Sequence, residues 1–191
     1  MNKAKMYALA AWIIAAIMLG ATWAQQSSST SITVSAGGVG TGQLAQISTE
    51  GLTGPSWSPV EDAVGSVTAG NLYKIQVPDG GRYRITLFLT DVDELVQAYS
   101  YLNLNVTIYA ISSENYSATL GQTLPAGATL KATEWLTLSN GRVILYVTGS
   151  SYYLVRVDDG VFYCTSTSNS DNLSPEFYIM VDSYDGIFTI G

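Results

Sequence analysis

The stretch from Asn71 to Leu89, NLYKIQVPDGGRYRITLFL, contains two runs in which apolar and polar residues alternate. In the second run, one face would carry four apolar residues and the other three polar ones: Tyr83, Ile85, Leu87 and Leu89 against Arg82, Arg84 and Thr86. An alternation with a period of two predicts a β-strand that has one buried and one solvated face. Residues 78–81, PDGG, are typical of a turn. The stretch therefore predicts two strands joined by a turn.

The same pattern recurs along the rest of the chain. Further strand signals are LNLNVTIYAI, ATEWLTLS, RVILYVTG, YYLVRV, GVFYC, EFYIMV and GIFTI. Asn140-Gly141 predicts a hairpin between ATEWLTLS and RVILYV, and Asp158-Asp159-Gly160 predicts another between YYLVRV and GVFYC. The count is nine to eleven strands, which favours an all-β fold, a jelly-roll-like β-sandwich.

One segment reads as a helix. In TDVDELVQAYSY, Thr90 is followed three residues later by Asp93, and acidic residues fill the first turn. Leu95, Val96 and Tyr99 have the spacing of one helical face. We expect at most one short helix, near residues 91–99, covering an end of the sandwich.

Residues 1–24 predict a secretory signal peptide. Lys3 and Lys5 precede an uncharged run of 18 residues, Met6 to Trp23, and Thr22-Trp23-Ala24 ends it with small residues at the positions a signal peptidase reads. The run also reaches the lower limit for a membrane span, so a retained anchor or the N-terminal helix of a type IV pilin is the alternative. Cleavage would leave a secreted chain of 167 residues (191 − 24), with no membrane segment. It would comprise an extended segment, 25–45, and a sandwich domain, 46–191.

Composition argues against enzymatic chemistry and against nucleic acid. The chain has no His, which removes Ser-His-Asp and Cys-His catalysis and the commonest metal ligand. Paired carboxylates could still act as glycosidase acids, but none is singled out by its context, so we expect no enzyme and no cofactor. There are 8 Lys and Arg against 15 Asp and Glu, without a basic cluster that would neutralise phosphates. Cys164 is the only cysteine and is expected to be a small buried residue in a strand, with an intermolecular disulfide as the alternative.

The glycine-rich stretch SITVSAGGVGTGQLAQIS, residues 31–48, could be a nucleotide-binding loop or an extended strand. Gly40-Thr41-Gly42-Gln43-Leu44-Ala45 matches a dinucleotide-binding fingerprint, with Glu61 downstream, but glycines and prolines interrupt the residues that would have to form the helix. The segment is therefore either a first strand followed by a loop, or a donor strand that completes the sheet of a neighbouring subunit. The face that a donor strand would insert is Ile32, Val34, Ala36, Gly38, Gly40, Gly42 and Leu44.

An export signal, an extended N-terminal segment and a β domain containing DELVQAYSYLNLNVTIY resemble the archaeal bundling pilins and their bacterial relatives, the TasA and camelysin biofilm-fibre proteins. The resemblance implies an extracellular, cell-surface filament, a homopolymer built by head-to-tail donor-strand complementation. A carbohydrate-binding sandwich that displays exposed aromatic residues is the alternative function, with cell-surface or matrix glycans as its ligands.

Two further groups of residues are candidate sites. Asp91, Asp93 and Glu94 form the densest acidic cluster and are weak candidates for binding Ca²⁺, but favourable charges at a helix N-terminus also explain them. Asp182 and Asp185 are similarly weak candidates for metal binding, with turn formation as the alternative explanation. Three N-x-S/T sequons are candidate glycosylation sites: Asn105 in mid-strand, and Asn115 and Asn172 in loop-like contexts.

Overall fold

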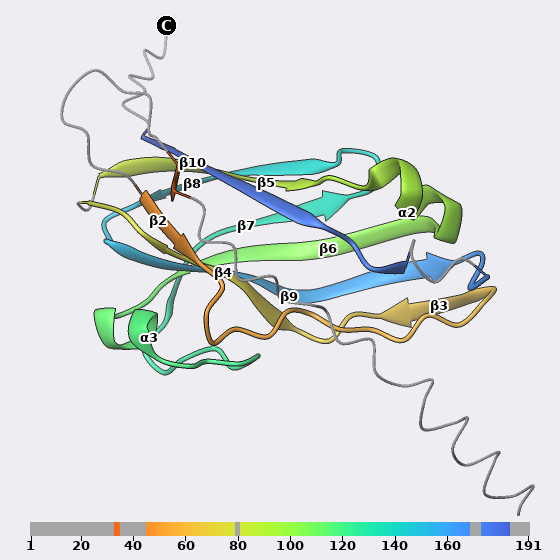
Figure 1. Cartoon of the computed structure of the whole chain (residues 1–191), viewed down its shortest axis with the longest axis horizontal. Coiled ribbons are helices and arrows are strands. Elements are labelled where there is room, and N and C mark those ends of the chain that lie inside the picture. Colours follow the sequence, from red (N-terminus) through yellow and green to blue (C-terminus); the bar gives the residue numbers. More distant parts are fainter. Residues whose placement is uncertain (1–32, 35–44, 79–80, 169–172, 184–191) are drawn as a thin grey trace, which may run out of the picture.

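The protein is an antiparallel β-sandwich of two sheets (Figure 1). The structure, a computed structural model, describes residues 33–34, 45–78, 81–168 and 173–183. The larger sheet has the strand order β1-β2-β4-β9-β6-β7, with β3 also paired to β9, and the smaller sheet has the order β10-β5-β8. The prediction of an all-β sandwich is confirmed, with ten strands in the described residues.

The elements follow one another across both sheets. The strands of the larger sheet are β1 (Thr33–Val34), β2 (Ala45–Ser48), β3 (Ala63–Ser66), β4 (Gly70–Gln76), β6 (Tyr99–Ala110), β7 (Thr129–Thr137) and β9 (Tyr152–Cys164). Those of the smaller sheet are β5 (Arg82–Leu89), β8 (Arg142–Thr148) and β10 (Phe177–Ser183). The helices are α2 (Val92–Ala98) and α3 (Ser113–Ser117). The chain passes between the sheets at every connection from β4 to β10 except β6–β7, the arrangement expected of a jelly roll.

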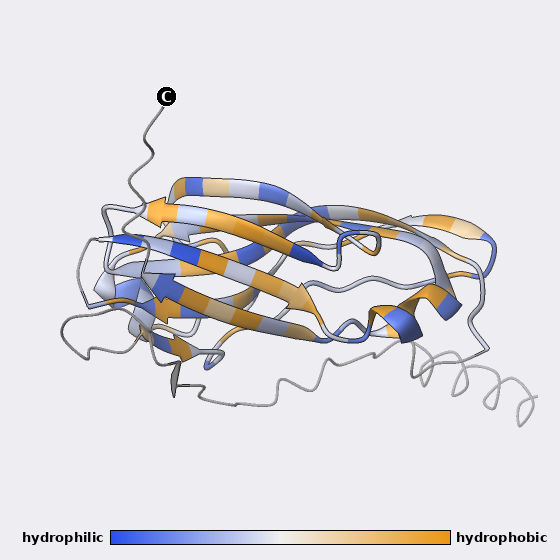
Figure 2. Cartoon of the chain, turned by 90° about the horizontal axis from the view of Figure 1, so that it is seen from above, coloured by the Kyte–Doolittle hydropathy of each residue, from blue (hydrophilic) through white to orange (hydrophobic). Residues whose placement is uncertain are grey.

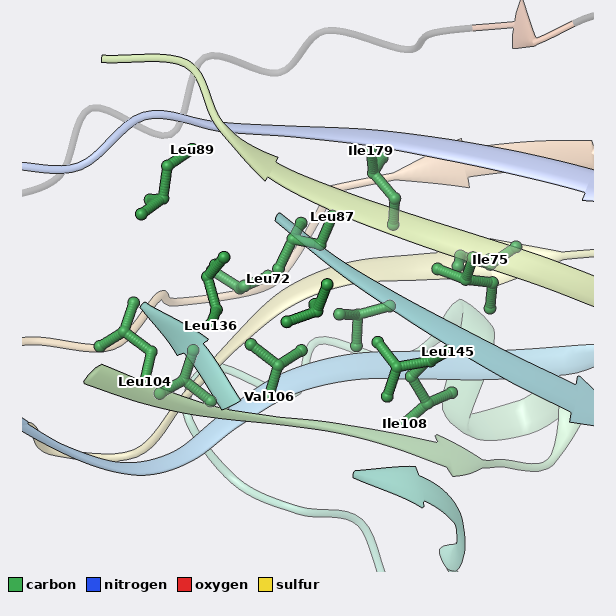
Figure 3. Packing of buried hydrophobic residues seen from close by; sticks show 14 of the residues in the cluster. Leu72, Ile75, Leu87, Leu89, Leu104, Val106, Ile108, Leu136, Leu145 and Ile179 are labelled. Carbon is green, nitrogen blue, oxygen red and sulfur yellow. The ribbon is translucent and has the colours of Figure 1, made fainter. Parts of the chain in front are cut away.

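The core lies between the two sheets and is built by the alternation seen in the sequence. Hydrophobic and hydrophilic residues alternate along several strands in Figure 2, which places one face of each strand inside. Figure 3 shows side chains of the two sheets meeting, among them Ile75, Val106 and Ile108 from one sheet and Leu87 and Ile179 from the other, all fully buried. Because the only cysteine, Cys164, is unpaired, no disulfide within the chain adds to the stability that this close packing provides.

The expected hairpin at Asp158-Asp159-Gly160 is wrong, because β9 runs unbroken through these residues. Opposite them, Asn105 pairs with Asp159 and Val106 with Val157, so Asp158 is an extra residue that forms a β-bulge. Gly160 is needed for packing, since a Cβ atom there would lie 2.7 Å from the carbonyl oxygen of Asn103. Residues 158–160 therefore form a bulge and a close contact within β9, and β6 and β9 stay paired on both sides of them.

The Asn140-Gly141 turn exists but does not close a hairpin. Gly141 has φ of 60°, and its N–H donates to the carbonyl of Thr137 at 2.9 Å. The strands on either side belong to different sheets, since β7 pairs with β6 and β8 pairs with β5. Turn chemistry alone identifies a reversal of the chain and not which strands pair across it.

The expected helix is confirmed as α2, but the described residues contain a further short helix, α3, whereas at most one was expected. The N-cap of α2 is Asp91 rather than Thr90, and Leu95 and Tyr99 are buried while Val96 is 53% exposed, so Val96 does not share their face. The start of α3 is stabilised by the hydroxyl of Ser112, which accepts from the N–H of Asn115 at 3.1 Å. Among the described residues, no helix is long and apolar enough to cross a membrane.

Candidate functional site

The most unusual surface of the sandwich is the edge formed by β10. Its first five residues, Phe177 to Val181, are apolar, and Ile179 and Val181 point into the core. On one side β10 pairs with β5 from Phe177 to Ser183. Within the described ranges, no strand pairs with its other side. The strand has seven residues, and its only charged one, Asp182, pairs with Arg84. An edge strand that begins with five uncharged residues is a template for pairing with a further strand.

Strands β2 and β10 lie on the same side of the sandwich (Figure 1). Strand β2 forms that side of the larger sheet, and β1 adds two residues to it, with Thr33 opposite Gln46 and Val34 opposite Ala45. The hydroxyl of Tyr73 on β4 donates to the carbonyl of Phe177 at 2.7 Å, and burial raises its pKa to about 12. This bond fixes the start of β10 above β4.

Most of the residues predicted for the donor strand lie outside the described ranges. They are Ile32, Ala36, Gly38, Gly40, Gly42 and Leu44. Val34 belongs to β1, which pairs with β2 of its own chain. Ala45 begins a strand, so the helix that a dinucleotide-binding loop would require does not follow the glycines.

The sequons occupy different environments. Asn105 lies on the outer face of β6, where its side-chain oxygen accepts from the hydroxyl of Thr133 at 2.8 Å. Asn115 lies in α3 and not in a loop, because the Ser112 cap orders that segment. Asn172 is outside the described residues.

The acidic candidates do not converge on one point. Asp93 and Glu94 are exposed in the first turn of α2, whereas the carboxylate of Asp91 accepts from the N–H of Glu176 at 3.0 Å. Burial raises the pKa of Asp91. The described residues contain no group of three or more potential metal ligands. Asp182 forms an ion pair with Arg84 at 2.8 Å, and Asp185 lies outside the described ranges.

A buried polar cluster lies on the outer face of the larger sheet, centred on Arg156. Its guanidinium donates to the carboxylate of Asp158 at 2.6 Å. The hydroxyls of Thr107 and Tyr109 donate to the other oxygen of that carboxylate, at 2.7 and 2.6 Å. Asp158 lies on the same side of β9 as Arg156, two residues earlier, so the two side chains form an ion pair.

The cluster anchors the connection between β6 and β7 to the sheet. Arg156 donates to the side chain of Asn71 at 2.8 Å and to the carbonyl of Gln122. Asn71 donates in turn to two further carbonyls of that connection, and Lys74 donates to the carbonyl of Ala118 at 2.6 Å. Burial lowers the pKa of Lys74, while Glu50 opposes that change. The polar groups of this cluster form their hydrogen bonds with other groups of the same chain, so we assign the cluster a structural role.

Asp158 should make stability depend on pH. Burial by itself would raise its pKa, but hydrogen bonds from Tyr109, Thr107 and Arg156, together with the positive charge of Arg156, lower it overall. A carboxyl whose pKa is lower in the folded state stabilises that state above the unfolded pKa of about 3.9, and the contribution is lost as the pH falls.

We therefore expect the free energy of unfolding to fall between pH 5 and acid conditions, and to fall less in Asp158→Asn. Urea unfolding at a series of pH values measures both. Equal pH dependence in the two proteins would show that Asp158 does not contribute.

Cys164 is confirmed as a buried strand residue. It is fully buried at the end of β9, and burial raises the pKa of its thiol. A buried thiol with a raised pKa is a poor nucleophile.

Sequence reasoning missed the cluster around Arg156 because its members come from three strands and a connection far apart in the chain. The available signal was a single arginine, Arg156, inside the apolar run YYLVRV, because an arginine in a buried strand requires hydrogen-bond partners inside the protein. Neither a protein-family model nor a curated protein matches the chain. Two features of the geometry distinguish the chain: the uncharged first five residues of the β10 edge and an ion pair with a buried arginine outside the core.

Proposed function

We propose that the protein is a secreted structural subunit of an extracellular filament, in which residues 32–44 of one copy pair with the edge of β10 in the next. The observation that carries the proposal is that edge, whose residues Phe177 to Val181 carry no charge and no proline. Natural sheets protect such edges with charges, prolines or a covering segment, because an exposed edge recruits other strands. A strand from a neighbouring copy would supply the cover.

The edge of β10 is a better acceptor than the edge of β8. Strand β8 lies against the nine-residue β7 across the sandwich, and the turn at Leu138–Gly141 connects them directly. On the other side, β10 has seven residues, while the nearest edge strands of the larger sheet, β2 and β1, have four and two. A strand added beside β10 would therefore extend the smaller sheet on the side where the strands of the larger sheet, β1 and β2, are shortest.

The contact of β1 with its own chain is short enough to be exchanged. Two paired residues contribute about 2 kcal/mol at a net value of about 1 kcal/mol per hydrogen bond. A strand along the whole edge of β10 would form several such bonds and bury Ile32, Val34 and Leu44 in addition. Donation in one direction does not close on itself, so it produces a filament and a homopolymer.

The filament proposal predicts that removing the donor segment abolishes assembly and leaves a folded domain. A secreted chain with residues 25–191 should form filaments in negative-stain electron micrographs, whereas a chain that begins at Ala45 should stay monomeric. Addition of a peptide spanning residues 31–44 should raise the melting temperature of the shortened chain, since it binds only the folded state.

Two results would oppose this proposal. Filaments from the shortened chain would exclude donation by residues 32–44, and a monomeric 25–191 chain under all conditions would exclude assembly. An intact mass that retains residues 6–23 in native filaments would favour the type IV pilin alternative.

A further inference from the structure

The outer face of the smaller sheet carries an unusual combination of arginines and exposed apolar side chains. Pairing of β8, β5 and β10 aligns their outward residues in rows: Arg142, Phe88 and Tyr178; then Ile144, Thr86 and Met180; then Tyr146, Arg84 and Asp182; then Thr148 and Arg82. Tyr146, Tyr178 and Ile144 are 51%, 40% and 39% exposed. The rings of Phe88 and Tyr178 pack with their centroids 6.2 Å apart. We call these rows the arginine face.

The distribution of positive charge is what sets this face apart. The described residues contain six Lys and Arg, of which Lys74 and Arg156 are buried in contacts described above. Three of the other four, Arg82, Arg84 and Arg142, lie on the arginine face, and Lys131 lies on β7. Twelve acidic residues occur in the described ranges, but only Asp182 belongs to these rows. Among the described residues, most of the exposed or half-exposed cations thus surround one apolar strip, although one of them, Arg84, is paired with Asp182.

We infer that the arginine face binds an anionic polysaccharide. The rings of Tyr178 and Tyr146 offer flat apolar surfaces on which the C–H faces of sugar rings pack, since an aromatic face is negative and attracts C–H edges. Guanidinium groups recognise carboxylates with two parallel hydrogen bonds. Arginines at both ends of the strip match a ligand that carries carboxylates along its length.

The dimensions of the face select an extended ligand over a globular one. Three strands span about 10 Å, and the six-residue separation between Phe88 and Arg82 on β5 spans about 20 Å. The resulting strip of roughly 200 Å² is far below the ~800 Å² that each partner buries in a stable protein complex. Face-to-face pairing of two copies would also bring their arginines together. A linear chain of acidic sugars fits both the width and the charge.

The remaining acidic surface does not prevent this binding at physiological salt, where charges beyond about 8 Å are largely screened. A nucleic acid has a denser row of phosphates than three arginines neutralise, and single strands are bound through longer basic grooves. The binding site uses the outward side chains of β10, whereas the filament proposal uses the backbone edge of that strand, so the two can be tested apart.

The inference is tested by titrating the secreted chain with polygalacturonate, with neutral amylose and with oligothymidine in parallel. Polygalacturonate should bind at low salt and dissociate as NaCl is raised to about 0.5 M. Arg82→Gln and Arg142→Gln should each weaken binding about three- to five-fold, and their combination about ten-fold or more. Tyr178→Ala should weaken it by a similar factor to one arginine.

The chain offers matched controls on the other sheet. Lys131→Gln removes an exposed cation and Trp135→Ala an aromatic ring that is 45% exposed, both on β7, and neither should change the affinity. Unchanged circular dichroism spectra would show that the variants fold. Binding of amylose or oligothymidine as tight as that of polygalacturonate, no binding of polygalacturonate, or equal weakening by the β7 controls would each overturn the inference. Retained binding by a chain unable to form filaments would separate this result from the filament proposal.

Discussion

Replacing Gly70 by Ala is expected to lower the free energy of unfolding by about 3–4 kcal/mol, a loss at the upper end of what overpacking causes. Gly70 begins β4 beneath the segment that holds Gly54 and Pro55, and a Cβ atom there would overlap backbone atoms of both residues. Backbone atoms cannot rotate away as the end of a flexible side chain can. The two segments would have to separate, which would break the 2.9 Å bond from the N–H of Asn71 to the carbonyl of Thr53.

A second glycine separates crowding from backbone strain. Gly127 has φ of 78° and no atom within 4 Å of the position of a Cβ, so Gly127→Ala tests strain without crowding. We expect it to cost about 1 kcal/mol. Urea unfolding followed by tryptophan fluorescence measures both variants. Equal losses in the two would show that the segments around Gly54 and Gly70 are free to move apart.

Replacing Arg156 by Leu is expected to cost about 2–4 kcal/mol. The side chain of Arg156 is only 10% exposed. Its removal leaves one carboxylate oxygen of Asp158, the side-chain oxygen of Asn71 and the carbonyl of Gln122 without the donor they have in the folded protein. Loss of one partner of a buried ion pair costs about 3–5 kcal/mol, and the 27% exposure of the Asp158 side chain reduces that value. The connection between β6 and β7 should also become more sensitive to protease, because its carbonyls lose their anchor.

The ion pair of Arg84 with Asp182 is the matched control, since its N–O distance is 2.8 Å but the arginine side chain is 42% exposed. Arg84→Leu should cost less than about 1 kcal/mol, as surface pairs do. A similar cost for Arg84→Leu and Arg156→Leu would mean that burial does not govern the stability of the cluster.

The sequence predicted the sandwich because burial of one face imposes a period of two, and this pattern is local. The strand at residues 82–89 followed from it directly, and helix α2 followed from another local signal, its acidic first turn and helical spacing. Pairing is not local, so the same reasoning took Asp158-Asp159-Gly160 as a turn and Asn140-Gly141 as a hairpin. In the first case hydrogen bonds from β6 hold the Asp residues within a continuous strand, and in the second the chain crosses to the other sheet.

The sequence alone could predict some features of the proposed sites better than others. The edge of β10 could be suspected from FYIMV, an uncharged run, but strand order alone shows that no described strand pairs with its outer side. The arginine face depends on register, because Arg142 and Arg82 are 60 positions apart in the sequence and share one surface only through β5. The residues proposed as the donor strand lie mostly outside the described ranges, so that part of the filament proposal comes from the sequence pattern alone.

The central claim, that residues 32–44 of one copy pair with β10 of another, is tested most directly by amide hydrogen exchange of Phe177–Ser183. About half of the amides of an edge strand point away from its partner and exchange readily. In the chain that begins at Ala45, addition of the 31–44 peptide should slow their exchange about ten-fold or more and leave Arg142–Thr148 of β8 unchanged. The same protection should occur in filaments of the 25–191 chain. Filaments in which the β10 amides exchange as fast as in the shortened monomer would contradict the claim.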